Sequence, residues 1–127
     1  MSLRSPLGRA RGLGSAKSGT QHWWAQRLTA IALVPLTIWF VIAMVAATGS
    51  DHASAREFIG NPVTAVLLIL LIVATFHHAQ LGLQVVIEDY VHTKPVEIAL
   101  LIAVKGAAIV LALIAIFAVL SIAFGGA

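Results

Sequence analysis

Val63–Tyr90, VTAVLLILLIVATFHHAQLGLQVVIEDY, is a long apolar run with two adjacent histidines near its middle. It exceeds the roughly 20 residues that a helix needs to cross about 30 Å of hydrocarbon. Lipid accepts only helices or closed barrels, and the run lacks strict apolar–polar alternation, so it predicts a transmembrane helix. His77 and His78 would then lie deep in the bilayer, where a polar group without a partner is penalised. This placement indicates that an imidazole nitrogen has a bonding partner within the membrane.

Two more apolar runs, Leu28–Thr48 and Val96–Phe124, flank this stretch, and the chain is 60% hydrophobic and only 10% charged. Its mean hydropathy is +0.98, whereas soluble domains are about 25% charged. We predict an all-α integral membrane protein without a soluble domain, with three transmembrane helices at about 24–48, 63–91 and 96–124. Residues 1–20 would form an N-terminal arm, and Gly49–Asn61 a solvated loop in which His52 has no role. Three helices enclose little, so a partner anchor subunit is expected to complete a larger bundle.

The basic residues predict the orientation of the chain. Five of the eight Lys and Arg residues precede or open the first helix: Arg4, Arg9, Arg11, Lys17 and Arg27. By the positive-inside rule, the N-terminus and the loop around Lys94 are cytoplasmic, and the loop with Arg56 and the C-terminus lie outside. We therefore attribute the net charge of +3 to the orientation of the chain in the membrane rather than to binding of nucleic acid. The absence of cysteine excludes disulfides, iron–sulfur ligation by this chain and a thiolate nucleophile.

Four residues of the central helix share one face: His78, Gly82, Val85 and Asp89 are spaced i, i+4, i+7 and i+11. A histidine followed one turn later by glycine suits a flat macrocycle, because the missing side chain lets the ring edge approach the backbone. His77 is rotated by about 100° and has no glycine in register, so His78 is the preferred metal ligand. The alternative is that both imidazoles bond to groups of neighbouring helices.

One histidine does not supply both axial ligands of a six-coordinate haem, so the second is expected from a partner subunit. Zinc fits less well, because its sites generally assemble several protein ligands. At the cytoplasmic end of the helix, Tyr90 beside Asp89 can donate a hydrogen bond to a quinone carbonyl and relay protons, with Glu88 and His92 as entries for them. A plain interfacial role for Tyr90 remains the alternative. Arg27 either snorkels to phosphate or pairs with a buried anion.

These residues resemble the smaller membrane-anchor subunits of succinate dehydrogenase, respiratory complex II. The resemblance covers most of the chain, from about residue 13 to the end. The matching pieces are Arg27-Leu28-Thr29-Ala30-Ile31, His78-Ala79, Gly82, Gln84, Asp89-Tyr90-Val91 and Lys94-Pro95. The spacing of histidine, glycine and Asp-Tyr is the specific part of this pattern.

The resemblance implies roles for particular residues. His78 would be the axial ligand of haem b, with the second axial histidine in the larger anchor subunit. Arg27 would pair with a haem propionate, and His22 lies near a position that could approach one too. Tyr90 and Asp89 would bind ubiquinone.

The resemblance also implies the rest of the assembly. A flavoprotein subunit with FAD and an iron–sulfur subunit would oxidise succinate and pass electrons to quinone, while this chain holds no succinate-oxidising residues. The location would be the bacterial cytoplasmic (inner) membrane. Alternatives are the anchor of a fumarate reductase, a noncatalytic membrane scaffold, and a small transporter or proton channel, the last weakened by the lack of further buried charges along a crossing path.

Overall fold

The computed structural model describes residues 5–7 and 19–125. In this part the chain forms α2 (Gly19–Ala46), α3 (His52–Gly60), α4 (Pro62–Tyr90) and α5 (Lys94–Ala123). The helices α2, α4 and α5 are long and apolar enough to cross a membrane, which confirms the three predicted spans. Most of the predicted N-terminal arm, with Arg4, Arg9, Arg11 and Lys17, lies outside the described residues. The first span begins at Gly19 rather than near residue 24.

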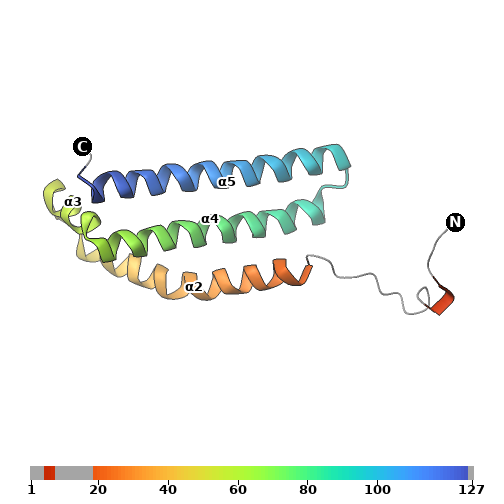
Figure 1. The fold of residues 1–127 in the computed structure, drawn as a ribbon, viewed down its shortest axis with the longest axis horizontal. Helices are drawn as coiled ribbons and strands as arrows, with labels where there is room; N and C mark the ends of the chain where they lie inside the picture. The colour runs from red at the N-terminus through yellow and green to blue at the C-terminus, as the bar shows by residue number, and fades with distance from the viewer. Residues whose placement is uncertain (1–4, 8–18, 126–127) are drawn as a thin grey trace.

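The three long helices lie side by side in one layer, with α4 between α2 and α5 (Figure 1). Within the described residues α4 packs against both neighbours, while α2 and α5 do not touch. Few side chains are buried, and those of the core belong mostly to α4: Thr64, Ala65, Ala74, Leu81 and Ile87. A single layer leaves much of α4 open on both sides, so these helices do not enclose a large group by themselves.

Local signals set the limits of α4. The Asn61 side chain caps its first turn, accepting from the backbone N–H of Val63 at 2.9 Å and of Thr64 at 3.4 Å. Pro62 follows at the first helical position, where its missing N–H costs nothing. The 29 residues of α4 span about 43 Å, so His77 and His78 lie close to its midpoint. The two imidazoles therefore lie near the middle of a helix that is long enough to span a membrane.

The segment predicted as a solvated loop contains a helix, α3, and that prediction is wrong for His52–Gly60. Asp51 caps α3, because its carboxylate accepts from the backbone N–H of Ser54 at 2.9 Å. The hydrogen bonds from Ser54 lower the pKa of the Asp51 carboxyl below its usual 3.8. Phe58 stacks on Trp39 of α2 with ring centroids 6.5 Å apart, which ties α3 to the layer.

Candidate functional site

His78 is half-buried on the side of α4 that faces α2. Its Nδ1 lies 3.0 Å from Oγ1 of Thr29, a residue 49 positions earlier in the chain. Among the described residues, Nε2 of this imidazole has no hydrogen-bond partner. The ring is therefore held through one nitrogen, and the other keeps its bonding capacity for a group from outside the chain.

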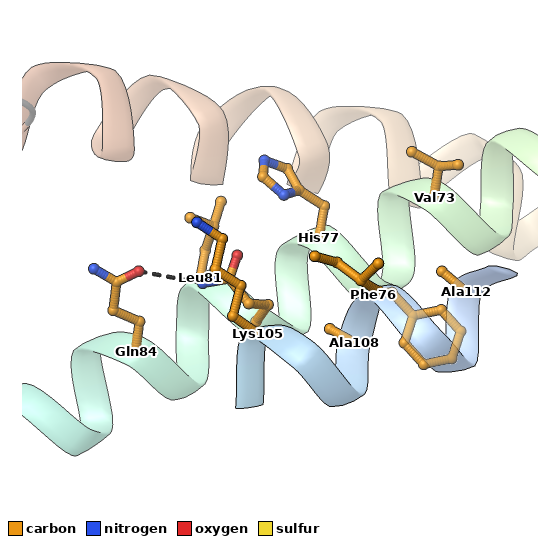
Figure 2. A pocket seen from close by; sticks show the side chains of 10 residues that line it. Val73, Phe76, His77, Leu81, Gln84, Lys105, Ala108 and Ala112 are labelled. Atoms are coloured by element: carbon orange, nitrogen blue, oxygen red, sulfur yellow. Dashed lines mark hydrogen bonds between the residues drawn. The ribbon is translucent and has the colours of Figure 1, made fainter. Parts of the chain in front are cut away.

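His77 is exposed and has different surroundings. It lines a cavity of about 620 Å³ between α4 and α5, together with Gln80, Gln84 and Lys105 (Figure 2). It also lines a second cavity of about 510 Å³ between α2 and α4, which includes His22. His78 lines neither of them. The His78 imidazole is thus held by a hydrogen bond, whereas the His77 imidazole lies beside open space.

Gly82 lies one turn after His78 and faces α2. A Cβ atom on Gly82 would meet only Nε2 of Gln26, at 3.7 Å, which is an ordinary van der Waals distance. Packing within this chain therefore does not require glycine at this position. If only glycine is tolerated at position 82, the reason must be a group bound from outside this chain that lies close to the backbone there.

The face of α2 opposite this part of α4 is polar. His22, Gln26 and Thr29 are spaced i, i+4 and i+7, so they share one side of the helix. Nε2 of His22 and Oε1 of Gln26 are buried and have no hydrogen-bond partner in the described part of the chain. Buried polar atoms in native proteins are generally paired, because an unpaired one carries its full desolvation cost. These two atoms indicate that a polar group from outside the chain belongs here.

Arg27 is exposed on α2, and its guanidinium carbon lies 5.1 Å from the centroid of the Trp23 ring. Trp23 in turn packs edge-to-face against Trp24, with centroids 5.0 Å apart and planes at 81°. Stacking on the aromatic ring positions the cation and leaves its N–H donors available for an anion.

Tyr90 and Asp89 end α4 and are exposed, Tyr90 by 80%. Neither side chain has a hydrogen-bond partner within residues 5–7 and 19–125. The phenol can therefore donate to a ligand that arrives from another component. Tyr90 lies about 18 Å along the helix axis from His78, so the two form separate parts of a site.

A polar ladder that the sequence analysis missed runs along α4. Nε2 of Gln80 donates to Oε1 of Gln84 at 3.2 Å, and Nε2 of Gln84 donates to Oε1 of Glu88 at 2.9 Å. The i, i+4 spacing of these three residues was the signal for it. Lys105 of α5 lines the neighbouring cavity (Figure 2). The proximity of Gln26 to Gly82 and the hydrogen bond between Thr29 and His78 were also missed, because both join different helices.

The structure thus brings His78 and Gly82 together with Thr29 and Gln26 across the α2–α4 contact. His22 and His77 meet in the adjoining cavity. Within the described ranges, no three His, Cys, Asp or Glu side chains gather in a way that could hold a metal ion. Each candidate ligating group therefore stands singly within the described residues.

Comparison with known proteins finds a matching family. Residues 1–123 match the family described as succinate dehydrogenase/fumarate reductase transmembrane subunit. The chain is 38% identical over 103 residues to the succinate dehydrogenase hydrophobic membrane anchor subunit of Rickettsia bellii, covering 81% of this chain and 82% of the relative. It is 36% identical over 86 residues to the subunit of the same name from Paracoccus denitrificans, covering 68% and 67%. A succinate dehydrogenase membrane anchor subunit of Reclinomonas americana is 29% identical over 85 residues, covering 65% and 71%.

Proposed function

Because the chain belongs to the succinate dehydrogenase/fumarate reductase transmembrane subunit family, we propose that it co-binds haem b and forms part of the quinone-reduction site. As a membrane anchor subunit of succinate dehydrogenase, it belongs to a complex with other subunits. In our proposal these are a flavoprotein, an iron–sulfur subunit and a larger cytochrome b-type anchor subunit. FAD and the iron–sulfur clusters belong to the soluble partners.

In this proposal His78 would hold the haem iron, and a second ligand would come from the larger anchor subunit. The observation that carries it is the hydrogen bond to Nδ1, while Nε2 has no hydrogen-bond partner among the described residues. Metal-ligating histidines commonly bond through their other ring nitrogen in this way. Haem b, when bound, supplies a one-electron redox centre, while the protein supplies binding and electrostatics.

The polar face of α2 fits the acidic edge of that group. Nε2 of His22, buried and without a hydrogen-bond partner among the described residues, lies on the same side of α2 as Thr29 and about 10 Å from it along the helix axis. Arg27, with its free N–H donors at the hydrocarbon edge, pairs with a propionate in this proposal, and His22 assists it. The residues present fit the group, because the His78 imidazole and the buried polar atoms of His22 and Gln26, unpaired in the described part of the chain, occur where α2 meets α4. The exposed guanidinium of Arg27 extends from a different side of α2.

Tyr90 and Asp89 bind the quinone in our proposal. The exposed phenol donates a hydrogen bond to a quinone carbonyl and orients the ring, and the neighbouring carboxylate holds a proton close to it. Quinone reduction consumes protons, so a site at the end of a helix, close to water, serves the reaction. This requires the end of α4 to be cytoplasmic, as the distribution of Lys and Arg indicates. The membrane is then the bacterial inner membrane.

Purification through a tag on this chain tests the proposal. We expect a flavoprotein and an iron–sulfur protein to copurify, succinate to reduce ubiquinone, and a reduced-minus-oxidised spectrum to show a b-type haem. A preparation without haem, or without a flavoprotein, would contradict it. Fumarate reduction by a quinol in strong excess over the reverse reaction would instead favour the fumarate reductase alternative, to which the family description also extends.

A further inference from the structure

We propose that Thr29 is a positioning residue that fixes the tautomer and ring orientation of His78. In this role it tunes the iron that His78 holds, so the inference rests on the proposed haem ligation by His78. The juxtaposition is the 3.0 Å contact between Oγ1 of Thr29 and Nδ1 of His78.

The proton count of the Thr29 hydroxyl decides the direction of this hydrogen bond. Oγ1 lies 2.7 Å from the carbonyl oxygen of Ala25 and 3.1 Å from that of Gln26. A threonine hydroxyl has one proton to give, and carbonyl oxygens only accept, so the proton goes to the α2 backbone at the shorter distance. Oγ1 then accepts the hydrogen bond from Nδ1–H. The imidazole is consequently the Nδ1–H tautomer, with its lone pair on Nε2.

The bond also fixes the orientation of the ring. Thr29 is β-branched and half-buried, and its hydroxyl is tied to its own helix, so its side chain has little freedom. In the described part of the chain it is the only side chain of α2 that hydrogen-bonds to α4. The orientation of the His78 ring is therefore set by how α2 lies against α4.

This arrangement has a measurable consequence for the metal. A hydrogen bond from Nδ1–H raises the basicity of the ligating nitrogen, and losing such a partner typically lowers metal affinity by about 10–100-fold. A more basic ligand stabilises the oxidised iron. Without the Thr29 hydroxyl we therefore expect weaker haem retention and a higher midpoint potential.

Thr29→Val tests the inference in the assembled complex, because it removes the hydroxyl and keeps the branched shape. Thr29→Ser keeps the hydroxyl, and Thr37→Val removes an exposed hydroxyl elsewhere on α2. Haem per flavin, the haem midpoint potential and the ferric electron paramagnetic resonance spectrum are measured for each. We expect a raised potential, a changed spectrum and less haem per flavin in Thr29→Val alone, because the affinity for haem should fall by about 10–100-fold. If Thr29→Val does not assemble, Thr29→Ala provides the same comparison.

A wild-type potential and spectrum in Thr29→Val, or equal shifts in Thr29→Val and Thr37→Val, would overturn the inference. His78→Ala separates this outcome from failure of the proposed function. If haem is lost in His78→Ala but is unaltered in Thr29→Val, the role of Thr29 is contradicted and His78 remains the ligand. Haem fully retained in His78→Ala removes the ligand itself.

Discussion

His77 and His78 are adjacent in the sequence but meet different parts of the molecule. His78 is bonded through Nδ1 to Thr29 at 3.0 Å, whereas His77 is exposed and lines the cavities on both sides of its position. Successive helical residues point about 100° apart, so the two imidazoles do not serve one metal ion from the same side. A ligand already held in place loses little conformational entropy on binding, which favours His78.

Tyr90→Phe removes the phenolic hydroxyl and keeps the ring. We expect the turnover of succinate with ubiquinone to fall about fivefold, since one net hydrogen bond contributes about 1 kcal/mol. The Tyr90 side chain is exposed at the end of α4 and makes no hydrogen bond within the described residues, so we expect the fold to tolerate the substitution.

The control for Tyr90→Phe is succinate oxidation with an artificial dye that accepts electrons from the soluble subunits. Dye reduction should stay at the wild-type rate. Unchanged quinone turnover in the variant would remove Tyr90 from the quinone site.

Gly82→Ala separates a demand of the fold from a demand of the cofactor. The added Cβ would lie 3.7 Å from Nε2 of Gln26, so packing within the chain accepts it, and alanine favours a helix over glycine by about 1 kcal/mol. If the haem edge approaches this backbone, we expect lower haem content in a complex that still assembles. Gly106→Ala, at a glycine of α5 with open space around it, is the matched control. Full haem content in Gly82→Ala would show that the macrocycle does not lie against Gly82.

Arg27→Leu tests the pairing with a propionate. Loss of a cation near the haem disfavours the more negative reduced form, so we expect the midpoint potential to fall, in the direction opposite to that of Thr29→Val. Arg27→Lys keeps the charge and should retain most of the wild-type potential. An unaltered potential in Arg27→Leu would leave Arg27 as an interfacial residue that stacks on Trp23.

The long helices could be predicted from the sequence because membrane spans depend on length and apolarity, which single residues report directly. The helix α3 escaped prediction because it is short and polar, and because the stacking of Phe58 on Trp39 that supports it is a tertiary contact. The face shared by His78 and Gly82 followed from helical spacing alone.

The residues of α2 that contact this face of α4 could not be predicted from the sequence. Thr29 is 49 residues from His78, and spacing within one helix does not say which neighbour it meets or in which register. The orphaned atoms of His22 and Gln26 are likewise visible only after α2 and α4 are packed together. Local periodicity thus pointed to His78 as the candidate ligand, and only the packed structure revealed its hydrogen bond to Thr29.

The most direct test of haem ligation compares His78→Ala with His77→Ala in the purified complex by reduced-minus-oxidised spectroscopy. The account predicts that the b-type signal is lost in His78→Ala and kept in His77→Ala. A signal that survives in His78→Ala and disappears in His77→Ala would contradict it and move the ligand to His77, beside the open cavities.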